Sequence, residues 1–196
     1  MTPLDDLHSY VQEAKRLLDA LPGQVERLAD LLYRAFQEGR TVFVIGNGGS
    51  ASNATHFAQD LAKGTLTDLS APRRLRALAL TDNVSFLTAL SNDIGYEVVF
   101  EEQLKTYAQP SDVLIAFSGS GNSPNVLRAV EWANRQGLIT VGFTGFDGGR
   151  LRPLAQVSIH VPCYHMGIVE SVHCFAFHWV VSTLRRRLAP GGDAHA

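Results

Sequence analysis

The sequence contains little cysteine and little charge. Its two cysteines among 196 residues, Cys163 and Cys174, lie outside any Cys-x-x-Cys pair, which argues against a disulfide framework and against a zinc knuckle. Charged residues make up 18% of the chain, and the formal net charge is -2. This balance supplies no basic surface for nucleic acid or for an anionic membrane, so we expect neither as a main partner.

An apolar run long enough to cross a membrane is also missing. The best candidate, 174–181, contains His178 and falls well short of the roughly 18 residues that a span needs. Residues 1–17 contain acidic side chains and no apolar segment, so we expect no secretory leader. The sequence has no internal repeat and is 45% hydrophobic, which predicts one globular domain over residues 1–196, located in the cytoplasm.

Hydrophobic periodicity predicts helices that alternate with strands. Apolar residues recur at helical spacing over 4–21 and 24–38, with Pro22-Gly23 between them, before any strand-like run. The expected strands downstream are 41–45, 75–80, 113–117, 139–143 and 157–161. The expected helices are 50–63, 85–91, 98–107, 122–136 and 167–187. This alternation predicts a parallel sheet of about five strands with helices on both faces.

Some residues are expected to have structural roles only. Trp132 and Trp179 have apolar neighbours at helical spacing, so we predict that both lie in the core. His173 is expected to have a packing or a surface role. Residues 190–196 follow the last helix and are expected to form a flexible tail.

Two glycine-rich loops each follow an expected strand and precede an expected helix. They read Gly46-Asn47-Gly48-Gly49-Ser50 and Ser118-Gly119-Ser120-Gly121-Asn122-Ser123. Glycine lets the backbone approach an anion closely, and a helix N-terminus presents free N–H groups. Neither loop contains the Gly-Lys-Ser/Thr of a Walker motif, and Ala51 takes the last glycine position of a dinucleotide fingerprint. Either loop alone is compatible with a tight turn, whereas both together favour a phosphorylated small molecule.

Four titratable residues form two helical pairs. His56 and Asp60 are four residues apart, on one face of an expected helix, and Glu170 and His178 are eight apart on the last helix. Two imidazoles and two carboxylates are a suitable ligand set for zinc or a similar divalent cation. Spacing alone is a weak signal, because a His-x-x-x-Asp pair usually lies at a surface and His178 is also compatible with a hydrogen-bonded core position.

Several blocks of the sequence resemble the sugar isomerase (SIS) domain, and more narrowly its phosphoheptose isomerase branch. They are GNGGSASNATHFAQDL from residue 46, the Asn92-Asp93 pair, FSGSGNS from residue 117, TGFDGG at 144–149 and the segment Glu170 to His178. The resemblance covers roughly residues 5 to 187. It implies a flavodoxin-like three-layer α/β sandwich that forms a homotetramer with sites at subunit interfaces. It also implies that the helical pair within 1–38 makes oligomer contacts.

The resemblance also assigns roles to the titratable residues. His56 and His178 match zinc ligands of the family, Asp60 stands where the family has its catalytic glutamate, and Glu170 stands where it has glutamine. The implied metal ligands are therefore His56, Asp60, Glu170 and His178. Asp60 is the implied base, Glu170 competes for that role because it adds a carboxylate, and His178 is the implied acid.

The implied substrate contacts lie mainly in the two glycine-rich loops. They are Asn47, Gly48, Gly49, Ser50, Asn92, Asp93, Ser118, Gly119, Ser120, Ser123 and Glu170. Gly119 departs from the family, which usually has threonine there. The leading hypothesis is a metal-assisted aldose–ketose isomerase of a sugar phosphate, most like sedoheptulose 7-phosphate isomerase, acting through an enediolate. The alternative is a non-catalytic SIS-fold protein that binds a sugar phosphate or a replication initiator. The full set of histidines and carboxylates argues against that alternative.

Overall fold

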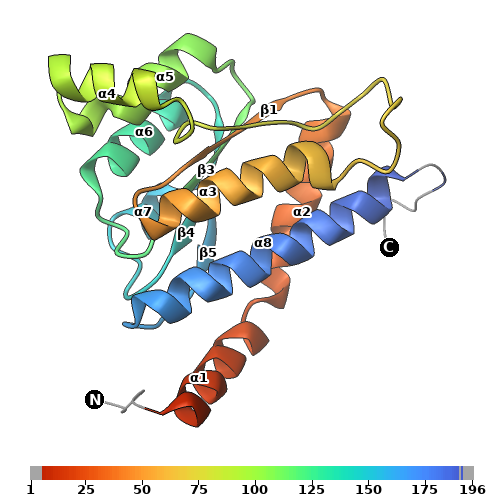
Figure 1. The fold of residues 1–196 in the computed structure, drawn as a ribbon, viewed down its shortest axis with the longest axis vertical. Coiled ribbons are helices and arrows are strands. Elements are labelled where there is room, and N and C mark those ends of the chain that lie inside the picture. The colour runs from red at the N-terminus through yellow and green to blue at the C-terminus, as the bar shows by residue number, and fades with distance from the viewer. Residues whose placement is uncertain (1–5, 190, 192–196) are drawn as a thin grey trace.

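The computed structural model of the chain describes residues 6–189 and residue 191 (Figure 1). Five parallel strands form one sheet in the order β2-β1-β3-β4-β5. They are β1 (Thr41–Ile45), β2 (Arg76–Ala79), β3 (Val113–Ser118), β4 (Ile139–Thr144) and β5 (Val157–His160). The expected parallel sheet is therefore confirmed, with each strand within two residues of its predicted bounds.

Helices cover both faces of the sheet, because the central strands are apolar on both sides. One apolar cluster joins the sheet to α1 (Leu7–Asp19), α2 (Pro22–Gln37), α3 (Gly49–Gln59) and α8 (Met166–Leu188). A second joins the opposite face to α4 (Val84–Asp93), α5 (Val99–Tyr107), α6 (Pro124–Arg135) and α7 (Leu151–Leu154). Every residue of β3 is buried, as this three-layer arrangement requires.

The N-terminal helices differ from each other in how they join the body. α2 begins at Pro22, whose missing N–H and fixed φ suit the first helical position, and it packs along α8. α1 extends away from the sheet, as Figure 1 shows, and meets the rest of the chain near α8. The expected tail at 190–196 lies outside the described residues, apart from Gly191.

Two local predictions were wrong. The helix expected over 50–63 changes at its end into a π-helical turn, Asp60–Gly64, which widens the last turn. Trp179 was expected in the core, yet its side chain is 37% exposed because it lies on the outer side of α8. Trp132 is partly buried against the second apolar cluster, in line with its prediction. None of the helices within the described residues is long and apolar enough to cross a membrane.

Of the packing and surface roles expected for His173, the structure shows packing. Its ring is fully buried on α8 beside Phe143, and Nε2 lies 3.2 Å from the carbonyl oxygen of Thr144. Nδ1 is buried without a hydrogen-bond partner, so a proton added there would place charge in an apolar site. Burial therefore lowers the pKa of His173 to about 4, although the bond to Thr144 opposes this shift.

The pKa of His173 predicts how stability changes with pH. Below the ordinary histidine value of 6.5 the unfolded chain binds a proton that the folded chain binds only below about 4. Stability is therefore lost as the pH falls through this window, by up to about 1.4 kcal/mol per pH unit. His173→Gln keeps an N–H donor without titrating, so its free energy of unfolding should vary less steeply between these pH values in urea titrations. Equal slopes in the two proteins would contradict the assignment.

Candidate active site

The two glycine-rich loops meet at one point of the sheet. β1 and β3 are neighbours, and the chain leaves them toward opposite edges, since β2 flanks β1 and β4 flanks β3. Open parallel sheets bind ligands at such a switch point, beyond the carboxyl ends of the strands. The loop after β1 leads into α3, and the loop after β3 leads into α6. Both loops therefore present a helix N-terminus to the same edge.

The loop after β1 is fixed by side chains that the sequence did not single out. The side-chain amides of Asn47 and Asn125 donate to each other, at 2.9 and 3.0 Å, and the hydroxyl of Tyr96 donates to the Asn47 oxygen. The amide of Asn47 is thus already occupied by partners in the protein. Gly48 has a φ of 55° at the helix start, a conformation that favours glycine.

The loop after β3 is fastened to the segment 145–151. The Leu151 amide donates to the carbonyl of Gly121, and the Gly145 amide donates to the carbonyl of Gly119, both at 2.9 Å. A Cβ at Gly121 would collide with the backbone oxygen of Gly148, so this contact requires glycine. The Ser118 and Ser123 hydroxyls lie 3.4 Å apart, near the start of α6.

Both loops line one open pocket of about 100 Å³, which is smaller than the roughly 300–1,000 Å³ of typical small-molecule sites. The residues that line it are Asn47, Ser50, Phe117, Ser118, Gly119, Ser120, Ser123, Met166 and Glu170. We refer to it as the serine pocket. Among the described residues, no lysine or arginine lines it, so its donors to an anion are hydroxyls and backbone amides.

Two glycines make room for the side chains from α8. The Glu170 carboxylate occupies the space that a Cβ at Gly49 would need. Likewise, the sulfur of Met166 fills the space beside Gly119. The threonine that the family usually has at 119 would meet this methionine, which is a physical reason for the glycine here.

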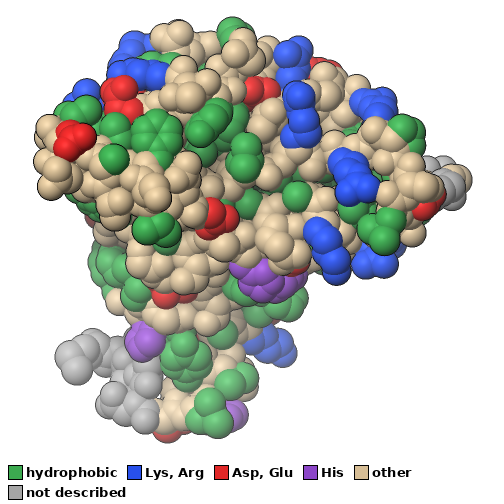
Figure 2. Space-filling view, turned by 45° about the horizontal axis from the view of Figure 1, so that its top comes forward, with side chains coloured by type: hydrophobic (Ala, Val, Ile, Leu, Met, Phe, Trp, Pro, Cys, Tyr) green, Lys and Arg blue, Asp and Glu red, His purple; other side chains and the backbone are tan. Residues whose placement is uncertain are grey.

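A second group of polar side chains lies where α3 and α8 pack together. Oδ2 of Asp60 is 3.4 Å from Nε2 of His56 and 3.4 Å from Nδ1 of His178. The imidazole centroids are 4.8 Å apart, and both rings lie against the buried ring of Phe177. Each imidazole is nearly half exposed, and Figure 2 shows a group of histidine side chains open at the surface.

The spacing of this histidine cluster fits a divalent metal. Both nitrogen–oxygen separations exceed the 2.7–3.2 Å typical of a hydrogen bond. Two ligands of a tetrahedral zinc ion, with bonds of about 2.0 Å, lie about 3.3 Å apart. Asp60 therefore stands close to the separation that zinc ligands require from each of His56 and His178.

Sequence reasoning missed Cys174 at this cluster. Ligand atoms of His56, Cys174 and His178 all lie within 4.8 Å of one another. The thiol is partly buried, and burial together with the charge of Asp60 raises its pKa. The signal that could have revealed it is its spacing of four residues from both Glu170 and His178 on one helix.

The structure separates other predicted residues from this cluster. Glu170 lies about 12 Å along α8 from His178, given the helical rise, and its carboxylate faces Gly49 in the serine pocket. Asn92 and Asp93 lie exposed at the end of α4, where the Asn92 amide donates to Asp93 at 2.8 Å. Neither of these two side chains lines the serine pocket within the described chain.

The chain is similar to known proteins in sequence and in fold. The family model described as SIS domain matches residues 8–145. The phosphoheptose isomerase of Geobacter sulfurreducens is 34% identical over 191 residues, which are 95% of this chain and 100% of the relative. The chain belongs to the phosphoheptose isomerase branch of the SIS domain family.

Further similarities extend across the SIS domain. A solved phosphoheptose isomerase from Francisella tularensis superposes with a TM-score of 0.85 and 29% identity, covering 94% of this chain and 99% of that one. The lincomycin biosynthesis protein LmbN of Streptomyces lincolnensis is 38% identical, covering 90% of this chain and 68% of that protein. The predicted fold class, the flavodoxin-like three-layer sandwich, is confirmed.

The close approach at Gly121 gives a test of the serine pocket. Gly121 has a φ of +68° and a blocked Cβ position, whereas Gly137 has a φ of +77° with open space around it. We expect Gly137→Ala to lower the free energy of unfolding by about 1–2 kcal/mol through backbone strain alone. Gly121→Ala should cost clearly more, because the loop must also leave the segment 145–151. Urea denaturation of both variants measures the difference, and equal losses would contradict the close approach.

Proposed function

We propose that this SIS-domain protein is an aldose–ketose isomerase that interconverts sedoheptulose 7-phosphate and a heptose 7-phosphate through an enediolate. The observation that carries the proposal is the position of two complementary groups on the same pair of helices. The serine pocket offers neutral donors for a phosphate, and the histidine cluster lies farther along α3 and α8. The names of the relatives support the substrate class.

His56, Asp60 and His178 would hold zinc or another divalent cation, because their separations fit such an ion. A metal there would supply a positive charge for sugar oxygens that bind at the cluster, about 12 Å along α8 from Glu170, and would so help to hold the sugar. The family resemblance adds Glu170 to the ligands. The structure places its carboxylate in the serine pocket instead, so we assign it a different role.

In our proposal Glu170 moves the proton between C1 and C2. Its carboxylate lines the pocket that would receive the substrate, whereas Asp60 lies between two imidazoles. A carboxylate bound to a metal is a poor free base, which favours Glu170 over Asp60 for this step. By the same argument His178, implied by the resemblance to be the acid, would serve as a metal ligand and not as a free acid.

The loops have separate tasks in this proposal. Ser118, Ser120 and Ser123 would donate their hydroxyls to the phosphate. The start of α6 adds few amides, because Pro124 has no N–H and the Val126 amide already donates to the Asn125 side chain. Gly48, Gly49 and Ser50 would bring the backbone at the start of α3 close to the sugar. Asn92 and Asp93 lie at the surface, so they would serve a site that a neighbouring copy completes.

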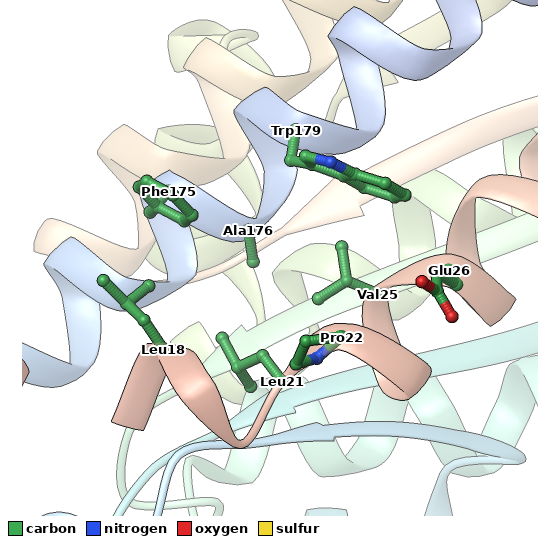
Figure 3. Close-up of a pocket in the computed structure, with 8 residues that line it drawn as sticks. All are labelled: Leu18, Leu21, Pro22, Val25, Glu26, Phe175, Ala176 and Trp179. Atoms are coloured by element: carbon green, nitrogen blue, oxygen red, sulfur yellow. The ribbon is translucent and has the colours of Figure 1, made fainter. Parts of the chain in front are cut away.

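We also propose that copies of the chain associate, as a homotetramer in the cytoplasm. Figure 3 shows an apolar groove in which Leu18, Leu21, Pro22 and Val25 face side chains of α8. Phe175 and Trp179 on its rim are 59% and 37% exposed, which is unusual for large apolar side chains in a monomer. α1 carries the exposed Leu7 and Val11 beyond the body.

The two free cysteines are compatible with the reducing conditions of the cytoplasm.

The catalytic proposal is tested by proton exchange. The purified protein, loaded with zinc, should exchange the C1 proton of sedoheptulose 7-phosphate in D₂O and form the aldose. Glu170→Gln should reduce both rates by about 10²–10⁴-fold, the usual contribution of a general base, while its metal content is unchanged. NMR follows the exchange, and metal analysis follows the zinc.

Asp60→Asn separates the two carboxylates. We expect it to lose metal and activity together. Loss of exchange with metal retained would instead assign the base to Asp60. A zinc-loaded protein that isomerises none of a panel of phosphosugars would overturn the isomerase and favour the non-catalytic binding protein.

The assembly proposal is tested at the groove. Trp179→Glu places a charge in the apolar surface, so it should shift the sedimentation coefficient to that of a smaller species. Tyr107→Glu is the matched control, because Tyr107 is an exposed aromatic residue on α5, on the opposite side of the sheet. A wild-type protein that sediments as a monomer would contradict the proposal.

A further inference from the structure

The side of α8 that faces the site carries three potential metal ligands in a row. Glu170, Cys174 and His178 follow one another at four-residue intervals and so share one stripe of the helix. The thiol stands in the middle, about 6 Å along the axis from each neighbour. The thiol could contact ligands at either end of this stripe, toward Glu170 or toward His178.

The contacts of Cys174 connect it to the histidine end. Its sulfur lies within 4.8 Å of one ring nitrogen of His56 and one of His178. Each imidazole also has a nitrogen 3.4 Å from Oδ2 of Asp60. A zinc-bound sulfur and nitrogen lie about 3.5 Å apart, so a small side-chain rotation brings the thiol to that separation. Among the described residues no hydrogen bond joins the thiol to another group.

We propose that Cys174 is a thiolate ligand of the divalent metal, together with His56, His178 and Asp60. Binding would release the thiol proton to solvent, and the sulfur would take the coordination position that the family resemblance gives to residue 170. Glu170 would then remain outside the ligand set, with its carboxylate in the serine pocket. The role of this centre in isomerisation rests on the proposed function, whereas its ligand set does not.

A sulfur ligand also determines which metals the site prefers. Thiolate and imidazole favour zinc and cobalt over magnesium and manganese, which prefer oxygen ligands. The ring of Phe177 beneath both imidazoles adds an apolar surface that limits water on one side. The chain should therefore select zinc or cobalt.

Cobalt substitution reads the sulfur ligand directly. The full-length protein titrated with Co²⁺ should show ligand-field bands of a four-coordinate ion and an intense near-ultraviolet sulfur-to-cobalt charge-transfer band. Cys174→Ser should lose the charge-transfer band and keep weaker ligand-field bands. It should also bind zinc at least about tenfold more weakly, because loss of a group that only supports a metal ligand already weakens binding by about that factor. Cys163→Ser and Glu170→Gln are the matched controls and should keep the band.

A second measurement avoids relying on a variant that fails to fold. Zinc should protect Cys174 of the wild-type protein from alkylation by iodoacetamide, as mapped by mass spectrometry, and magnesium should not. A cobalt complex without a thiolate band, a band that survives in Cys174→Ser, or alkylation unaffected by zinc would each overturn the proposal. A thiolate band in a protein without isomerase activity would uphold the metal centre and refute the proposed function alone. Isomerase activity without a thiolate band would refute Cys174 as a metal ligand and uphold the proposed function.

Discussion

Aromatic packing between α3 and α8 is the interaction on which the site depends. Phe57 of α3 stacks on Phe177 of α8 with ring centroids 4.9 Å apart, and Phe117 stacks on Phe143 below them at 4.3 Å. These four rings are fully buried, so they fix the distance between the two helices. His56 precedes Phe57 and His178 follows Phe177, and both imidazoles therefore stand at the rim of a rigid stack. The ring contacts, rather than any bound ion, therefore set the spacing of these candidate metal ligands.

The sheet was predictable because its signals are local. The β-branched run at 41–45 and the run at 113–117 have no polar residue in their interior, and each ends at a glycine or serine that opens a loop. The π-helical turn at Asp60 could not be predicted, because the residue types there continue an ordinary helical pattern. Trp179 was misplaced for a related reason, since periodicity does not show whether another element covers a given side of a helix.

The candidate site was predictable only in part. The histidines and carboxylates were identified by type and by resemblance, and the structure brings three of them together. The position of Glu170 was not visible in the sequence, because it depends on a contact between distant residues: its carboxylate lies in the space that a side chain at residue 49 would need. Cys174 was missed because a single cysteine carries no metal signal until its neighbours in space are known.

The neutral donors of the serine pocket also determine how a ligand is captured. A phosphate approaching this edge meets hydroxyls and amide dipoles, whose fields fall off quickly, and one carboxylate of its own sign. Long-range attraction therefore contributes little, and association should be slower than for a pocket lined with arginine. Because few charges are there for salt to screen, binding should vary little with ionic strength. The pocket would instead discriminate by geometry, accepting tetrahedral anions that satisfy every donor at once.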